Sequence, residues 1–198
     1  GTIVVAGEIR TQSYVDVQEI VRNTLRNIGY DRAKYGFDCE TCGVLSLIHE
    51  QSPDIAQGVD QSYDTQAGRT TDPLDLIGAC DQGMMFGFAS DETDVLMPMP
   101  AYLAQRLAQR LSEVRKSGEV EYLRPDGKTQ VTVRYEDEKP VEVTAIVVST
   151  QHAPEIEDMS VIKQDMIDHV IAPVMGAVNI AWDNADIYVN PAGRFVVG

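Results

Sequence analysis

Positive charge is scarce in this chain of 198 residues, where 16 lysines and arginines stand against 31 aspartates and glutamates, a formal net charge of −15. A nucleic-acid-binding surface needs a basic footprint, so the composition argues against a DNA or RNA partner. Long apolar runs are also missing: none approaches the roughly 18 residues typical of a transmembrane helix, and the first residues show no signal-peptide pattern. We therefore expect neither a nucleic-acid nor a membrane partner.

Cysteine is rare too, with Cys39, Cys42 and Cys80 as its three occurrences. Cys39 and Cys42 have the C-x-x-C spacing of redox and zinc sites, but the sequence offers no second pair or histidine cluster to complete a metal set. The alternative, which we favour, is two thiols at the start of a buried strand. An odd number of cysteines without a secretory pattern favours a reducing compartment and predicts a cytoplasmic protein.

What the chain does contain is ordinary for a globular protein: 43% of residues are hydrophobic and 24% are charged. Its length suits one or two domains with a sizeable core.

The first fifty residues show a strand–helix–strand pattern. Residues 2–9 are short and β-branched, and residues 44–48 alternate into a second strand. Between them residues 13–28 predict a helix that Gly29 ends. Its expected cap residues are Ser13 and Asp16, and its expected apolar face is Val17, Ile20, Val21, Thr24 and Ile28.

Residues 51–74 break this pattern, because glycine, proline, serine, threonine, aspartate and glutamine dominate and no amphipathic period is present. A structureless loop of this length inside a compact protein is either a functional lid or disordered.

Regular elements return further along the chain. We expect a strand at 84–89 and a helix at 100–116, ended by Gly118, with Leu103, Leu107, Leu111 and Val114 on one stripe. Three strands follow at about 120–123, 129–135 and 141–149, with a turn at 125–127 between the first two, and then a helix at 160–174 and a strand that begins at 186–190. Hairpins with helices on one face predict an α+β fold of mixed sheets.

The most informative segment is residues 78–98, GACDQGMMFGFASDETDVLMP. It places Asp81 between small residues, which let a ligand approach the backbone closely, and follows it with an apolar stretch that could hold the carboxylate in place. The alternative is an aspartate that caps a turn, because aspartate and glycine favour turns. The pattern alone leaves both interpretations open.

Segment 78–98 closely resembles the signature of S-adenosylmethionine synthetases, usually GAGDQG, MFGYA and NETxxxMP. Six more family segments follow the family's order: GEIRT at 7–11, GFDCETCGVL at 36–45, QSPDIAQGVD at 51–60, LRPDGKTQV at 123–131, STQH at 149–152 and NPAGRFVVG at 190–198. Two positions depart from the usual pattern: Cys80 replaces a glycine and Gly127 an alanine. The resemblance covers the middle part of the family's chain.

The resemblance implies pseudo-repeated lobes of sheet plus helices. It divides the chain into the remainder of the first lobe (1–50), an active-site lid loop (51–76) and the central lobe (77–198). The family's His-Pro-Asp-Lys motif and a potassium-binding glutamate are expected before Gly1, and its Gly-Arg-Lys stretch after Gly198. We therefore expect an incomplete chain that is inactive alone.

The activity implied by the resemblance is synthesis of S-adenosylmethionine from ATP and L-methionine, with cleavage of the triphosphate to pyrophosphate and phosphate. The expected cofactors are Mg²⁺ and K⁺, with ligands outside this chain. The expected assembly is a homodimer, or a dimer of dimers, with active sites at the subunit interface. The alternative is a catalytically inactive scaffolding or binding domain derived from the family.

Matching motif positions imply the site residues. Glu8, Gln51 and Asp81 correspond to methionine-binding residues, and Asp81 and Lys128 are the expected catalytic pair. The expected ATP-binding residues are Asp126, Gly127, Lys128, Arg194 and Phe195.

By pattern alone these residues have simpler explanations. Glu8 could be an exposed strand-end glutamate, residues 126–128 a plain hairpin turn, and Phe195 the start of a core strand. Among the histidines, His152 is expected to be structural, and His49 and His169 show no catalytic spacing.

Overall fold

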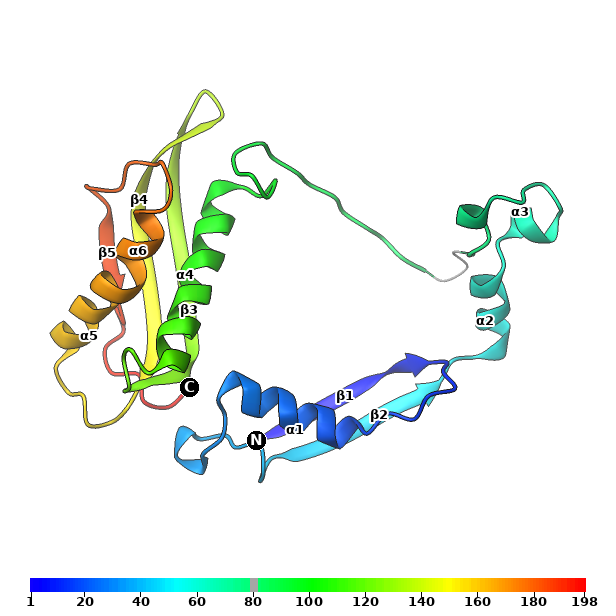
Figure 1. Cartoon of the computed structure of the whole chain (residues 1–198), viewed down its shortest axis with the longest axis horizontal. Helices are drawn as coiled ribbons and strands as arrows, with labels where there is room; N and C mark the ends of the chain where they lie inside the picture. Colours follow the sequence, from blue (N-terminus) through cyan, green and yellow to red (C-terminus); the bar gives the residue numbers. More distant parts are fainter. Residues whose placement is uncertain (79–81) are drawn as a thin grey trace. The chain divides into compact units, whose positions relative to one another are not determined.

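The structure, a computed structural model, describes residues 1–78 and 82–198 (Figure 1). It divides into two compact units, one formed by Gly1–Arg22 with Cys42–Gly87 and the other by Asn23–Thr41 with Phe88–Gly198. Helices accompany a two-stranded and a three-stranded sheet, which confirms the predicted α+β class. Within the described residues, no helix has both the length and the apolar character needed to cross a membrane.

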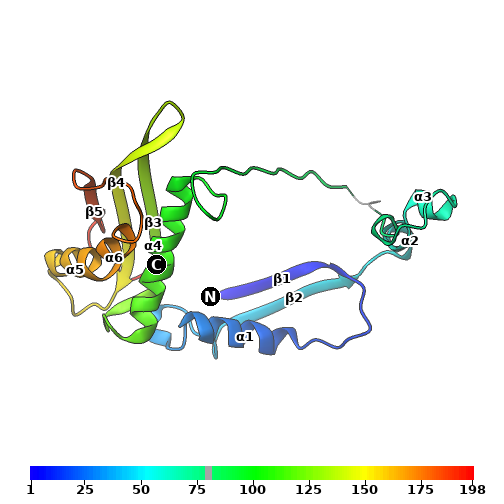
Figure 2. The same cartoon turned by 45° about the horizontal axis from the view of Figure 1, so that its top comes forward.

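The first unit contains the two predicted strands as a parallel pair. β1 (Thr2–Ile9) and β2 (Gly43–Glu50) run side by side in register from one end to the other (Figures 1 and 2). In this register Val4 lies beside Leu45 on one face of the sheet, and both side chains remain about half exposed. This sheet therefore has an apolar face that the described residues leave open.

Helix α1 (Val17–Ile28) starts later than predicted. The Asp16 carboxylate accepts the Glu19 N–H at 3.0 Å, so Asp16 acts as the cap and Ser13 lies outside the helix. Leu25 is the buried side chain of this helix, whereas Ile20, expected on the buried face, is 55% exposed. The buried stripe follows the four-residue spacing from Val21 to Leu25.

The segment predicted as a structureless loop contains short helices. α2 (Pro53–Asp60) starts behind a Ser52 cap, whose Oγ accepts the Asp54 N–H at 3.3 Å. α3 (Tyr63–Gln66) and a 3₁₀ turn (Pro73–Asp75) follow. Helices this short show little apolar periodicity, and serine caps with an N-terminal proline were the available signals. The lid role of residues 51–76 stays a prediction.

The predicted strand at 84–89 is wrong. The chain there is irregular, and Met85 and Phe86 are 89% and 88% exposed. An apolar run forms a strand only where a neighbouring strand accepts and donates its backbone hydrogen bonds, and no described residue pairs with this run.

The second unit is built around α4 (Met99–Ser117), close to the predicted helix. Its four predicted core residues are all buried, and Gly118 ends it in the left-handed conformation with φ +76°. Glu92, which precedes the helix, accepts the Met99 N–H at 2.9 Å. That hydrogen bond is the main reason why the pKa of Glu92 lies below its usual range.

Two long strands replace the three that were predicted. β3 (Leu123–Glu136) pairs antiparallel with β4 (Lys139–His152), and β5 (Asp186–Val189) joins β4 in parallel (Figure 2). The expected turn at 125–127 is an irregularity inside β3, because the register shifts between Leu123 and Gly127. The chain reverses instead at Asp137 and Glu138, both with positive φ, as a two-residue hairpin requires.

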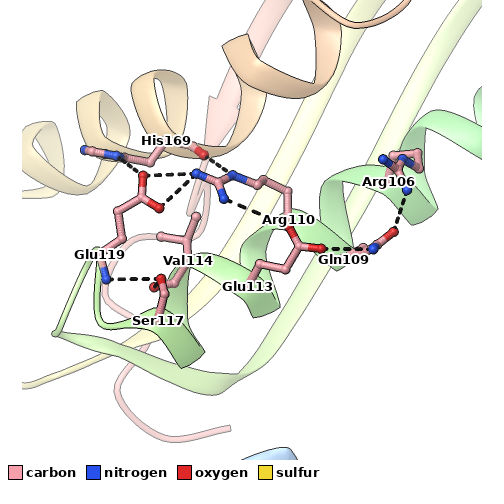
Figure 3. Close-up of polar contacts among 8 residues, drawn as sticks. All are labelled: Arg106, Gln109, Arg110, Glu113, Val114, Ser117, Glu119 and His169. Atoms are coloured by element: carbon pink, nitrogen blue, oxygen red, sulfur yellow. Dashed lines mark hydrogen bonds and ion pairs between the residues drawn. The ribbon is translucent and has the colours of Figure 1, made fainter.

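The predicted helix at 160–174 contains a π-helical turn. α5 (Met159–Met166) passes through it (Ile167–Ile171) into α6 (Ala172–Met175). Pro173 has no N–H to donate to the His169 carbonyl one helical turn earlier. Arg110 Nε of α4 donates to that carbonyl at 2.9 Å and satisfies it (Figure 3).

The core of the second unit lies between these helices and the sheet. Its fully buried large side chains come from α4, β4 and the α5–α6 segment: Leu103, Leu107, Val114, Val143, Ile146, Val148, Ile162, Met166, Ile171 and Met175.

A polar cluster joins the end of α4 to the π-helical turn (Figure 3). The Glu119 carboxylate accepts two hydrogen bonds from Arg110, at 2.9 and 3.0 Å, and contacts His169 Nδ1 at 2.7 Å. The hydrogen bond with His169 first, and then the Arg110 guanidinium, hold the pKa of Glu119 below its usual range.

Replacing Glu119 by glutamine is expected to lower stability at neutral pH. Because the pKa of Glu119 is depressed in the folded state, its contribution is present above the unfolded pKa and is lost as the pH falls through the folded pKa. The difference in Tm between wild type and Glu119→Gln should therefore shrink on acidification, as thermal unfolding at a series of pH values would measure. Glu121→Gln, an exposed neighbour, is the control. A pH-independent difference would contradict this assignment.

Candidate functional site

The predicted site residues fall into two groups. Glu8 and Gln51 belong to the first unit, and Asp126–Lys128 with Arg194 and Phe195 belong to the second. Asp81, the expected catalytic carboxylate, lies outside the described residues.

In the first unit the parallel register brings Glu8 and Gln51 to the same end of the sheet. Glu8 lies opposite His49, and Gln51 directly follows β2. The Gln51 N–H donates to the Ile9 carbonyl at 3.0 Å, which extends the strand pairing by one residue. Because side chains alternate, His49 and Gln51 belong to the face that carries Glu8. This end of the sheet therefore offers a carboxylate, an imidazole and an amide together.

In the second unit Lys128 and Phe195 lie against each other. Lys128 Nζ is 5.5 Å from the centroid of the Phe195 ring. Both line a cavity of about 220 Å³ at the edge of the sheet, to which β3, β4 and the chain after β5 contribute. Its remaining lining residues are Ser149, Asn190, Ala192, Gly193 and Arg194. Three predicted ATP-binding residues thus surround one space.

Asp126 and Gly127 do not line this cavity. Asp126 is half-buried, and its N–H donates to the Gln151 side chain at 3.4 Å. Gly127 lies close to α4, and a Cβ there would come within 2.7 Å of Leu111 Cδ2. An alanine at position 127 would therefore require a shift of the Leu111 side chain, whereas glycine leaves that side chain in place.

The segment that carries Phe195 is held by His152. The backbone N–H of His152 donates to the Phe195 carbonyl at 2.9 Å, and the ring nitrogen Nε2 of His152 accepts the backbone N–H of Phe195 at 3.1 Å. Since Nε2 is the acceptor, the ring proton lies on Nδ1, which donates to the Ala153 carbonyl at 2.9 Å. His152 is fully buried, which confirms its predicted structural role: it holds the backbone of Phe195 in place.

Asn190 is a further supporting residue, which none of the sequence motifs had indicated. It has φ +43° directly after β5, and its side-chain amide pairs with both backbone groups of Thr150, at 2.8 and 3.0 Å. Asparagine tolerates this conformation better than most residues, and the Asn-Pro pair at 190–191 was the available signal for a turn. This turn directs residues 192–195 around the cavity.

The cavity can accept an aromatic, anionic ligand. Phe195 offers a ring face to the cavity. Lys128 and Arg194 add two positive charges to its lining, although the chain as a whole is acidic. Arg194 Nη2 donates to the Pro154 carbonyl at 3.1 Å, which fixes one side of its guanidinium. An aromatic ring stacks on a nucleobase, and ammonium and guanidinium groups bind phosphate.

Comparison with known proteins identifies the family of this chain. The family description "S-adenosylmethionine synthetase, N-terminal domain" matches residues 1–53, and "S-adenosylmethionine synthetase, central domain" matches residues 76–195. S-adenosylmethionine synthases of Clostridium acetobutylicum and Clostridium botulinum are 56% and 53% identical over all 198 residues. The chain spans about half the length of these curated relatives (50% of each). This chain belongs to the S-adenosylmethionine synthetase family.

Proposed function

We propose that the complete gene product transfers the adenosyl group of ATP to the sulfur of methionine. Family membership supports the reaction class, and the observation that carries the assignment to this chain is the arrangement of Lys128, Arg194 and Phe195 around one cavity. These residues lie within the matched central domain.

The reaction sets clear electrostatic demands. The methionine sulfur attacks the 5′ carbon of ATP, the bond from that carbon to the triphosphate oxygen breaks, and a sulfonium product forms. Water then splits the triphosphate into pyrophosphate and phosphate. A site for this chemistry needs cations at the triphosphate, carboxylates near the sulfonium, and alignment of sulfur with carbon.

On the nucleotide side, Phe195 would stack on adenine, an interaction of roughly 1–3 kcal/mol for a base on an aromatic ring. Lys128 lies over that ring. A base stacked on the same face would displace the ammonium group, and the flexible lysine stem lets it turn toward the phosphates. Arg194 would add a second cation on the same rim.

On the methionine side, Glu8 and Gln51 meet at one end of the parallel sheet. Glu8 would pair with the substrate's ammonium group, and Gln51 would contact the amino acid from the segment that follows β2. Asp81 would hold the same ammonium group and offset the positive charge that develops on sulfur.

Asp81→Asn is expected to lower kcat/KM for methionine by roughly 10–100-fold, because a hydrogen bond to a charged group contributes about 1.5–3 kcal/mol. Tm should change little. Steady-state kinetics with methionine as the varied substrate measure the effect. Kinetics equal to those of wild type would remove Asp81 from the site.

We propose that the expected Mg²⁺ and K⁺ ions take their protein ligands from outside this chain, as the family resemblance implies. Among residues 1–78 and 82–198, no three His, Cys, Asp or Glu side chains gather closely enough to hold a metal ion. The contribution that we propose for this chain is therefore made by its own side chains.

We also propose that the complete protein forms at least a homodimer that shares active sites. The open face of the β1–β2 sheet supports this, since Val4, Leu45 and Leu47 are each at least half exposed there. Sedimentation at micromolar concentration tests it: a dimer or tetramer agrees, and a monomer contradicts it.

The function is tested by incubating the complete gene product with ATP, methionine, Mg²⁺ and K⁺. We expect S-adenosylmethionine, pyrophosphate and phosphate in equal amounts, and no product from the 198-residue chain alone, which spans half of its relatives. A complete gene product that binds ATP and methionine but forms no product would favour the inactive binding domain instead.

A further inference from the structure

A charged pair joins the end of β1 to the end of α2. Arg10 Nη1 donates to Asp60 Oδ2 at 2.7 Å, and Arg10 Nη2 donates to the other carboxylate oxygen. The two side chains are 48% and 47% exposed. Most exposed ion pairs contribute little, but a bidentate guanidinium–carboxylate pair has the geometry that can contribute.

Asp60 occupies an unfavourable position in its helix. It is the last residue of α2, where the helix dipole is negative, and the last turn contains no basic residue. Arg10, 50 positions earlier in the chain, supplies the missing positive charge. The hydrogen bond from Arg10 also lowers the pKa of Asp60. The last turn of α2 is therefore stabilised from outside the helix, by the residue that directly follows β1.

The same strand also holds the start of this segment. The Gln51 N–H donates to the Ile9 carbonyl, and Ser52 then caps α2. Residues 51–60 are thus attached at both ends to adjacent residues, Ile9 at the end of β1 and Arg10 directly after it. An α-helix is stiff, so two attachments fix both the place and the direction of this segment.

We infer that Arg10 and Asp60 are positioning residues for the methionine half of the site, because their pair holds the segment that begins with Gln51 against the strand that carries Glu8. This inference rests on the proposed function. Arg10 lies two residues after Glu8, so loss of the Arg10–Asp60 pair would shift residues 51–60 relative to Glu8. Neither residue needs to touch the substrate for this role.

The test uses kinetics of the complete gene product. Arg10→Gln should raise KM for methionine about three- to tenfold and leave KM for ATP unchanged, since it removes the pair and leaves a carboxylate at the helix end. Adding Asp60→Asn to Arg10→Gln should recover part of the loss, because the unfavourable charge is then gone. Arg10→Lys should retain part of the effect of the pair.

Arg69→Gln is the matched control. Arg69 pairs with Asp64 at 3.2 Å in the chain that follows α2, without reaching β1. It should leave KM for methionine unchanged. Equal KM values for wild type and Arg10→Gln, or equal increases in Arg10→Gln and Arg69→Gln, would overturn the inference.

Hydrogen exchange of residues 53–60 provides a readout that does not depend on catalysis. Arg10→Gln should speed exchange in the last turn of α2, whereas Arg69→Gln should not. Unchanged exchange would overturn the inference even in an active enzyme. A wild-type gene product without adenosyl transfer is a different result, because it removes the proposed function, and the methionine-positioning role with it.

Discussion

Lys128→Ala is expected to lower kcat/KM for ATP by about 10²–10³-fold, the loss typical of removing one preorganised charge or donor from a transition state. Lys128 lies over the Phe195 ring and lines the same cavity. Its ammonium group is therefore close to the proposed adenine position. The flexible side chain lets this group stay in contact with the phosphates as the triphosphate leaves. Steady-state kinetics of the complete gene product, with ATP as the varied substrate, measure the loss.

Two variants make this result specific. Lys128→Arg keeps the charge and should recover part of the activity, although a planar guanidinium does not replace a compact ammonium group fully. Lys139→Ala removes an exposed lysine at the opposite end of the β3–β4 hairpin and should have no effect. A Lys128→Ala enzyme within threefold of wild type would exclude Lys128 from the transition state.

Asn190→Ala is expected to destabilise the protein by about 2–6 kcal/mol and to lower its Tm. Asn190 is buried, and its side chain satisfies both the N–H and the carbonyl of Thr150, which is also buried. Alanine leaves both backbone groups without their partner, and each such loss costs about 1–3 kcal/mol. Alanine also fits the positive φ of this position less well. Thermal unfolding of the complete gene product measures the loss.

Asn184→Ala is the control, because Asn184 is exposed in the connection that precedes β5. It should shift stability by less than about 0.5 kcal/mol. The Asn190→Ala protein should also show a raised KM for ATP, since the segment with Phe195 follows this turn directly. A fully stable Asn190→Ala protein would show that the amide pair with Thr150 contributes little.

Sequence patterns predicted the elements whose signal lies within their own residues. The leucine stripe of α4 and the glycine that ends it gave the helix to within a residue, because a 19-residue helix shows its period several times. Both strands of the first unit were also predicted, β1 from its many β-branched residues and β2 from its alternating pattern.

Elements that depend on distant partners were not predictable in this way. Met84–Ala89 has the composition of a strand, but a strand needs a partner that no local pattern reveals. The π-helical turn precedes Pro173, and the His169 carbonyl that Pro173 leaves without a donor is satisfied by Arg110, 59 positions away. The turn at 125–127 was wrong because the Pro-Asp-Gly signal also suits a bulge within a strand.

The candidate site likewise contains residues that the sequence indicated and supporting residues that it did not. Family motifs identified Lys128, Arg194 and Phe195 one by one, and the sheet brings them together. The residues that support them, His152 and Asn190, act on backbone groups 43 and 40 positions away, so no spacing rule could relate them to Phe195 or Thr150.

The most direct test of this account is the substrate dependence of Phe195→Ala in the complete gene product. If Phe195 stacks on adenine, its loss should raise KM for ATP by roughly 5–150-fold, the equivalent of about 1–3 kcal/mol, and leave KM for methionine unchanged. An unchanged KM for ATP, or equal increases for both substrates, would contradict the assignment of this cavity to the nucleotide.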